Sequence, residues 1–246
     1  APVIALMTVM RGRGFHIPRR SRLWLILMGV LMAGSSITLF ESYHYMSAGI
    51  ASTMLFVYPL MVAVLMALFF RERLKASTLC CIAMAMGGIV LLFKGDPNGD
   101  TLSVAGTVLV MISALTYALY IIGIDRRGLK ETPTLTIIFY VLCVGALFFG
   151  AKILVVPGET FTVPQHWYYW GCILALAVVP TVISFLCTTA SIHSIGPTPT
   201  AILGVLEPLT AVIIGVTVFG EQLTLREIGG IVLIVVAVSF VVAKKT

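Results

Sequence analysis

One acidic side chain stands in the middle of a long apolar stretch of this sequence. Glu207 lies about ten residues into the apolar run 198–219. In lipid, an ionisable residue at such a place is costly, usually faces the interior of a helix bundle and marks a route for ions or substrates. Removal from water favours the neutral acid, which would suit proton coupling or the binding of a cationic group. The structural alternative is a protonated glutamate that is hydrogen-bonded to a neighbouring helix.

Two prolines occupy similar places in two apolar runs. Pro59 and Pro208 each lie about ten residues into their run, which is near the middle of a spanning helix at about 1.5 Å per residue. Proline lacks a backbone donor and pushes away the carbonyl group four residues earlier, here that of Leu55 or Gly204. At membrane depth such a carbonyl must be satisfied by protein or must line a wet cavity. We therefore expect two kinked helices that line a pathway, with kinks needed only for packing as the alternative.

A third apolar run carries several polar side chains. Ser113, Thr116 and Tyr120 are spaced three and four residues apart, so a helix places them on one face, and Tyr117 is adjacent. Such a face could stack on a solute or form hydrogen bonds with it. Small hydroxyl groups also commonly join helices to one another within membranes. Both interpretations stay open.

Four further residues near the ends of the runs are candidates for gates or helix caps. Glu72 and Glu221 come just before helix N-termini, where a carboxylate complements the helix dipole. A gating salt bridge is the alternative for both. Glu41 and His44 lie at the end of another run, and we expect a solvated or interfacial role there, with a gate as the alternative.

The sequence lacks the signatures of several other kinds of site. No two histidines share a helix face, and the cysteines do not have the spacing of zinc ligands. The motifs His-Glu-x-x-His and Gly-x-Ser-x-Gly are absent, and no nucleotide-binding motif follows the glycines near the N-terminus. The sequence therefore predicts neither an enzyme nor a metal or cofactor site.

Composition identifies the surroundings of these residues as a lipid bilayer. Of the 246 residues, 59% are hydrophobic and 11% are charged, whereas soluble proteins carry about 25% charged residues. A spanning helix needs about 20 apolar residues. Eight complete runs of roughly that length are present, at 22–40, 48–70, 76–93, 102–124, 134–155, 168–190, 198–219 and 225–243.

The loops between the runs predict an orientation. If residues 11–21 are cytoplasmic, alternate crossings place thirteen of the 16 Lys and Arg residues inside, and only Lys94, Lys152 and Arg226 outside. Cytoplasmic loops of membrane proteins carry such an excess. The positive charge is therefore a topology signal and not a nucleic-acid site. It predicts an integral protein of the plasma (inner) membrane with a cytoplasmic C-terminus.

The sequence also contains a repeat. A shift of 149 positions places residues 44–93 on 193–242 without a gap, so that His44 meets His193, Pro59 meets Pro208 and Glu72 meets Glu221. The same shift pairs Tyr58 with Glu207. It makes residues 1–10 the tail of an interrupted helix, with roughly 47 residues expected before them. Each repeat then has five helices, and an odd number requires two copies inverted in the membrane, as in many secondary transporters.

Two segments carry a resemblance to a known family. Leu55-Phe56-Val57-Tyr58-Pro59, followed by Arg71-Glu72-Arg73-Leu74, and Leu206-Glu207-Pro208-Leu209, followed by Gly220-Glu221-Gln222-Leu223, resemble the EamA-type repeats of the drug/metabolite transporter superfamily. The resemblance implies an all-α, polytopic fold of two inverted five-helix repeats around a central solute pathway. Residues 1–94 would form the first repeat, without its first helix and most of its second, and residues 101–246 the second. Eight complete helices and a partial one are therefore expected in this chain.

The function that follows is secondary transport of small polar metabolites, such as amino-acid-like solutes, by alternating access and in the direction of efflux. Lipid and a small solute are the expected partners, with protons as a candidate coupling ion, and the oligomeric state stays open. A membrane channel and a membrane-embedded enzyme are the alternatives. A channel should show rings of like polar groups along one pore, and an enzyme should show paired catalytic groups at one depth. Neither pattern is found in the sequence.

Overall fold

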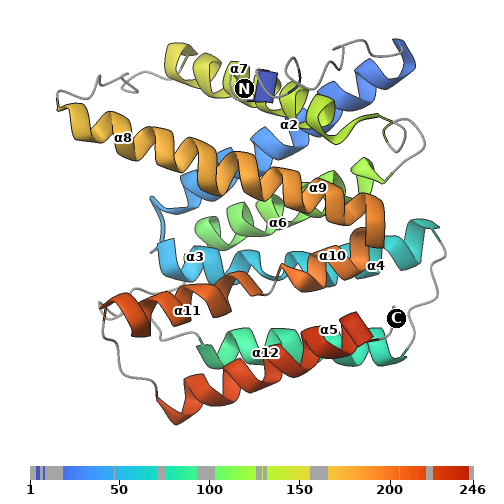
Figure 1. Ribbon diagram of the computed structural model, residues 1–246, viewed down its shortest axis with the longest axis vertical. Helices are drawn as coiled ribbons and strands as arrows, with labels where there is room; N and C mark the ends of the chain where they lie inside the picture. The colour runs from blue at the N-terminus through green and yellow to red at the C-terminus, as the bar shows by residue number, and fades with distance from the viewer. Residues whose placement is uncertain are drawn as a thin grey trace. The chain divides into compact units, whose positions relative to one another are not determined.

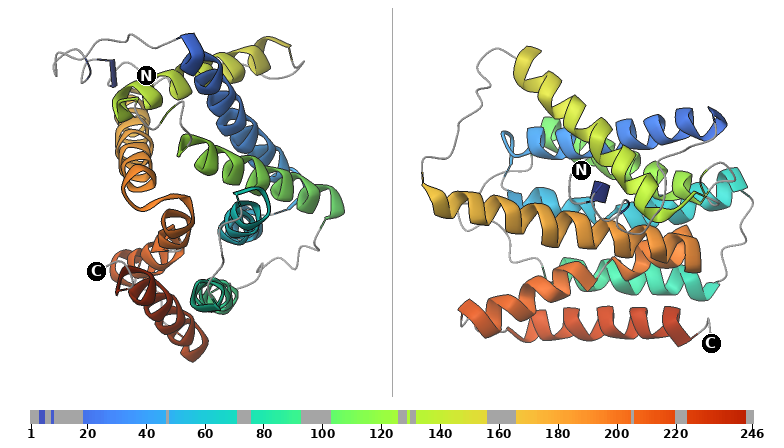
Figure 2. Two further views of the ribbon diagram at one scale, coloured as in Figure 1. Left: turned by 90° about the vertical axis from the view of Figure 1, so that its right-hand side faces the viewer. Right: turned by 45° about the horizontal axis from the view of Figure 1, so that its top comes forward.

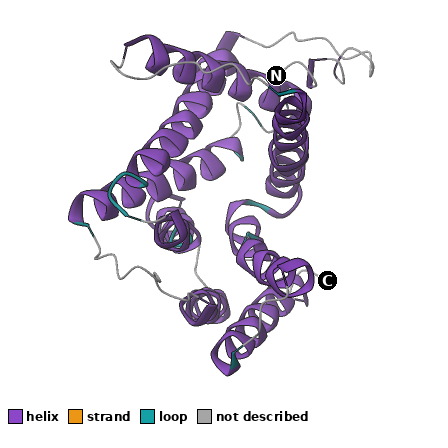
Figure 3. Cartoon of the chain, turned by 90° about the vertical axis from the view of Figure 1, so that its left-hand side faces the viewer, coloured by secondary structure: helices purple, strands orange, loops and turns teal. Residues whose placement is uncertain are grey.

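The computed structural model describes residues 4–5, 8, 19–46, 48–70, 76–92, 103–125, 129, 132–155, 166–204, 206–219 and 224–243 of the chain. Every regular element in these ranges is a helix (Figure 3). They are α2 (Arg19–Ser42), α3 (Ala48–Leu55), α4 (Tyr58–Phe70), α5 (Ala76–Leu92), α6 (Val104–Ile124), α7 (Thr134–Val155), α8 (Trp167–Leu176), the π-helical η1 (Ala177–Ile183), α9 (Ser184–Ile195), α10 (Pro197–Leu203), α11 (Leu206–Phe219) and α12 (Leu225–Ala243). Figure 1 labels all of them except η1.

The helices account for all eight predicted apolar runs. Five helical stretches are long and apolar enough to cross a bilayer, namely Ser21–Ser42, Ile50–Phe70, Val104–Ile124, Thr134–Val155 and Trp167–Ile195. Helical segments also cover the runs at 76–93, 198–219 and 225–243. The predicted all-α, polytopic membrane fold is therefore confirmed.

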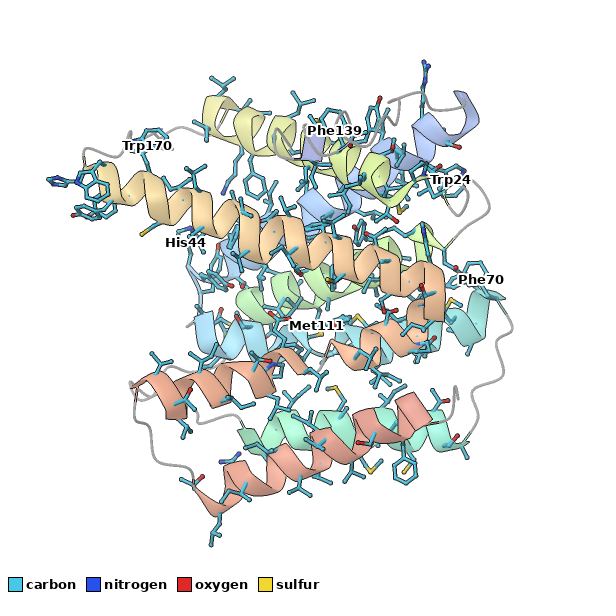
Figure 4. All side chains as sticks on the ribbon, viewed as in Figure 1. Trp24, His44, Phe70, Met111, Phe139 and Trp170 are labelled. Atoms are coloured by element: carbon cyan, nitrogen blue, oxygen red, sulfur yellow. The ribbon has the colours of Figure 1, made fainter. Side chains whose placement is uncertain are left out.

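Large apolar side chains are exposed along these helices. The exposed fraction is 75% for Leu23, 72% for Phe69 and 72% for Leu147. In water such surfaces would aggregate or bind a partner, but in a bilayer they face hydrocarbon at no cost. Trp167 and Trp170 are also exposed, at the beginning of α8 (Figure 4), where indole rings suit the boundary between lipid and water.

The chain divides into two compact units. The first comprises residues 1–34 and 123–196. Its core contains Ile4, Leu135, Ile138 and Val182, which belong to segments far apart in the sequence. The helix that carries Val182 has wider, π-helical turns around Pro180, and the Thr181 hydroxyl donates to the Leu176 carbonyl at 3.1 Å. The apolar run 168–190 predicted a helix without indicating these wider turns.

The second unit comprises residues 35–122 and 197–246 and contains both interrupted helices. One of its core clusters joins Ala63 of α4, Ile82 of α5 and Ile202 of α10. A second cluster contains Met46, Ile50, Ala51 and Val110. Both prolines singled out in the sequence analysis belong to this unit.

Within the second unit, α5 and α12 pack side by side (Figure 1 and Figure 2). The Arg226 side chain, in the first turn of α12, donates to the Val90 carbonyl near the end of α5 at 2.9 Å. Gly88 faces Ile234, further along α12. The two helices therefore run antiparallel.

The helix bounds in this unit follow the 149-residue shift. It moves the first residues of α3, α4 and α5 to positions 197, 207 and 225, and α10, α11 and α12 begin at Pro197, Leu206 and Leu225. Equivalent segments of the two predicted repeats thus have the same helix breaks. The repeat-related helices α5 and α12 are antiparallel, which is the relation that an inverted repeat requires.

Candidate functional site

Both predicted repeats have a helix that stops just before its proline. In the first, α3 ends at Leu55 and α4 begins at Tyr58. The N–H groups of Phe56 and Val57 donate to the carbonyls of Thr53 and Met54, at 3.2 and 3.1 Å. These bonds span three residues instead of four, which tightens the end of the helix. The α-helix is therefore interrupted between Leu55 and Tyr58, which is a larger change than the predicted kink.

The second predicted repeat has the same interruption. There α10 ends at Leu203 and α11 begins at Leu206. The Gly204 N–H donates to the Thr200 carbonyl at 3.1 Å, and the Glu207 N–H donates to the Gly204 carbonyl at 3.0 Å. The carbonyl that the proline was expected to displace is thus satisfied by the chain itself.

Tyr58 connects the two interruptions. Its side chain is buried, and its hydroxyl donates to the Ala201 carbonyl in α10 at 3.4 Å. The same hydroxyl lies so close to Gly204 that any Cβ atom there would collide with it. The glycine therefore creates the space in which α4 and α10 meet.

Three tyrosine rings, those of Tyr58, Tyr117 and Tyr120, are in successive contact here. The Tyr58 and Tyr117 centroids are 4.9 Å apart with an interplanar angle of 77°, an edge-to-face contact. The Tyr117 and Tyr120 centroids are 6.1 Å apart with an angle of 15°. Tyr120 is fully buried and Tyr117 is half-buried. Of these two tyrosines of α6, Tyr117 is therefore the more accessible.

Glu207 lies next to the contact between Tyr58 and Gly204. It occupies the first turn of α11, where the helix dipole favours a negative charge. Its side chain is exposed, and its N–H donates to the carbonyl of Gly204, the residue against which the Tyr58 hydroxyl lies. The structure thus brings together Tyr58, Tyr117, Gly204 and Glu207.

Two hydroxyl groups of α6, those of Ser113 and Thr116, form hydrogen bonds within the protein. The Ser113 hydroxyl donates to the Ser35 carbonyl at 2.8 Å, and the Ser35 hydroxyl is 3.1 Å from both the carbonyl and the hydroxyl oxygen of Ser113. Thr116 donates to the carbonyls of Ile112 and Ser113 in its own helix, at 2.9 and 3.0 Å. These contacts match the interhelical interpretation for Ser113. Its partner Ser35 was not identified from the sequence.

Two of the remaining candidates, Glu41 and His44, lie elsewhere. Glu41 is half-buried in the last turn of α2, its backbone carbonyl accepts from the His44 N–H at 3.1 Å, and the His44 side chain is exposed (Figure 4). Glu72 and Glu221 lie outside the described residues, so their roles as caps or gates stay predictions. Within the described ranges, no group of three or more metal-binding side chains comes together.

Comparison with known proteins gives the following matches. The model of the EamA-like transporter family matches residues 1–94 and 104–243. An uncharacterized transporter of Archaeoglobus fulgidus is 27% identical over 213 residues, which are 87% of this chain and 73% of that protein. The threonine/homoserine exporter RhtA of Escherichia coli (strain K12) is 24% identical over 212 residues, 84% of this chain and 66% of the exporter. A crystal structure of a protein with 20% sequence identity superimposes with a TM-score of 0.81. The match covers 99% of this chain and 84% of the chain in that structure, which shows a common fold.

Proposed function

Because this chain belongs to the EamA-like transporter family, we propose that it is a secondary transporter that exports small polar metabolites. Its solutes are amino-acid-like or related compounds. One relative is named a threonine/homoserine exporter, which supports this solute class and this direction. Membership in a transporter family also favours transport over catalysis.

One observation carries the proposal. Two helices, related by the 149-residue shift, are interrupted at equivalent positions before Pro59 and Pro208 and meet where Tyr58 contacts Ala201 and Gly204. Interrupted spanning helices at a repeat interface are typical of the substrate sites of secondary transporters. An exposed acid, Glu207, lies at this same point, and acids at such depth commonly mark a substrate or ion route.

Alternating access is the mechanism that suits this arrangement. Two near-equivalent repeats in opposite orientations can exchange inward-open and outward-open states, with the shared site staying near the membrane centre. The segments before Pro59 and Pro208 supply the places where backbone angles can change. We propose the plasma (inner) membrane as the location and a cytoplasmic C-terminus, on the basis of the excess of Lys and Arg in alternate loops.

Counterflow in proteoliposomes tests the proposal. Vesicles containing the chain are preloaded with unlabelled L-threonine, L-homoserine or a neutral sugar, and uptake of the labelled compound is followed. We expect transient, saturable accumulation of an amino acid above the level in protein-free vesicles. If no compound of the panel accumulates, transport of this solute class is contradicted.

The same experiment separates the alternatives. A channel would equilibrate the label without transient accumulation, because it does not couple the movement of one solute molecule to that of another. An enzyme would convert the solute, which chromatography of the vesicle contents detects as a product without flux.

A further inference from the structure

Glu207 is an acid for which the described part of the chain offers no counter-ion. No Lys, Arg or His in that part lies within 4.0 Å of its carboxylate, the distance of an ion pair, and its side chain is exposed. An acid in a spanning segment is costly unless a partner offsets its charge. The first turn of α11 partly favours the negative form. A cationic solute would supply the missing partner.

The groups around Glu207 suit an organic cation. The half-buried ring of Tyr117 and the buried ring of Tyr58 lie in edge-to-face contact. The Tyr58 hydroxyl lies against Gly204, whose carbonyl accepts from the Glu207 N–H at 3.0 Å. An ammonium group is attracted to the face of an aromatic ring. A carboxylate also accepts charge-assisted hydrogen bonds from the N–H groups of the ammonium.

A metal cation fits these groups less well. Ca²⁺ needs about six to eight oxygen ligands. In the described ranges, metal-binding side chains do not gather in groups of three or more. The combination of one carboxylate with aromatic rings therefore selects a cation with a carbon skeleton.

We infer that Glu207 and Tyr117 bind the ammonium group of the exported solute. The Glu207 carboxylate forms the ion pair, and the half-buried ring of Tyr117 contacts the cation. Tyr58 is a positioning residue, because its hydroxyl is bonded to the Ala201 carbonyl and its ring contacts that of Tyr117. This inference rests on the proposed function, since it identifies the part of the transported solute that the site recognises.

Calorimetric titration of the chain in lipid nanodiscs tests the inference directly. The probes are n-butylammonium chloride, the neutral n-butanol and sodium chloride, at neutral pH and with empty nanodiscs subtracted. We expect saturable binding of butylammonium only. Glu207→Gln should weaken it at least about tenfold, because charge-assisted hydrogen bonds contribute roughly 1.5–3 kcal/mol.

Substitutions at Tyr117 separate the contribution of its ring to butylammonium binding from that of its hydroxyl. Tyr117→Leu should weaken butylammonium binding about fivefold, whereas Tyr117→Phe, which keeps the ring, should stay within about twofold of the original chain. Thr217→Val is the matched control, because Thr217 is exposed on the same helix as Glu207 and bonds only to the Ile213 carbonyl. It should bind like the original chain. The Tyr117 pair also gives an answer if Glu207→Gln fails to fold.

Two results would overturn the inference. One is equal binding of butylammonium and butanol, or no binding of either. The other is unchanged butylammonium binding in both folded Glu207→Gln and Tyr117→Leu. Counterflow of the amino-acid panel, run in parallel, keeps the two proposals apart. Flux without ammonium recognition contradicts this inference alone, and ammonium binding without flux contradicts the proposed function alone.

Discussion

The hydroxyl group of Tyr58 lies against the Cα atom of Gly204 and donates to the Ala201 carbonyl, 3.4 Å away. A methyl group at position 204 would collide with that hydroxyl and would come within 3.2 Å of Cζ of the same ring. Gly204→Ala should therefore lower the free energy of unfolding by about 1–3 kcal/mol, the usual cost of overpacking. Thermal unfolding in detergent micelles measures the change.

A second substitution identifies the cause of this loss. Tyr58→Phe removes the colliding oxygen, so Gly204→Ala combined with Tyr58→Phe should lose less stability than the two single changes added together. Gly145→Ala is the control, because a Cβ atom at Gly145 meets nothing within 4 Å. Additive losses would show that the glycine is needed for some other reason.

The antiparallel contact between α5 and α12 gives the second prediction. A Cβ atom at Gly88 would lie 2.6 Å from Cγ1 of Ile234 and 2.8 Å from the Gly230 carbonyl oxygen, whereas one at Gly87 would meet only Leu233, at 3.9 Å. Gly88→Ala should therefore destabilise the chain by about 1–3 kcal/mol. Gly87→Ala should be neutral or slightly stabilising, since alanine is the better helix former. Thermal unfolding of the two neighbouring variants makes the comparison, and equal midpoints would mean that α5 and α12 are not packed in this way.

Much of the fold could be predicted because the solvent of this protein is lipid. Apolar runs of spanning length predict helices directly, since the bilayer leaves few other ways to satisfy the backbone. The 149-residue shift then identified Pro59 and Pro208 as equivalent. The structure places both at helix interruptions.

The pairing of side chains could not be predicted in the same way. In lipid, the faces of a helix that contact protein and those that contact hydrocarbon are both apolar, so hydropathy does not tell them apart. The Ser35–Ser113 pair and the contact of Tyr58 with Ala201 depend on that choice of face. The π-helical turns of η1 were missed for a related reason, because a proline in an apolar run predicts a break without specifying its geometry.

The Ser35–Ser113 pair gives the third prediction. Both residues are buried, and each hydroxyl reaches the other residue's carbonyl. Ser35→Ala, Ser113→Ala and the double variant should form a cycle with a coupling energy of about 0.6 kcal/mol and at most about 1.7 kcal/mol, the range for polar pairs between membrane helices. Thermal unfolding supplies the values. Thr116→Val removes hydrogen bonds only within α6, so it should show no coupling energy with Ser35→Ala. A comparable coupling energy for that pair would mean that the hydrogen bonds between Ser35 and Ser113 are not the source of the coupling.

The predicted inversion of the two repeats gives the last prediction. Glu72 and Glu221 are equivalent under the 149-residue shift, and five helices in each predicted repeat would place equivalent loops on opposite sides of the membrane. In a chain whose 5 cysteines are replaced by serine or alanine, we introduce Glu72→Cys and Glu221→Cys separately. A membrane-impermeant maleimide should label position 221 in intact cells and position 72 only after the membrane is opened. Labelling of both positions from the same side would contradict the inverted repeat, and alternating access between the two halves would lose its structural basis.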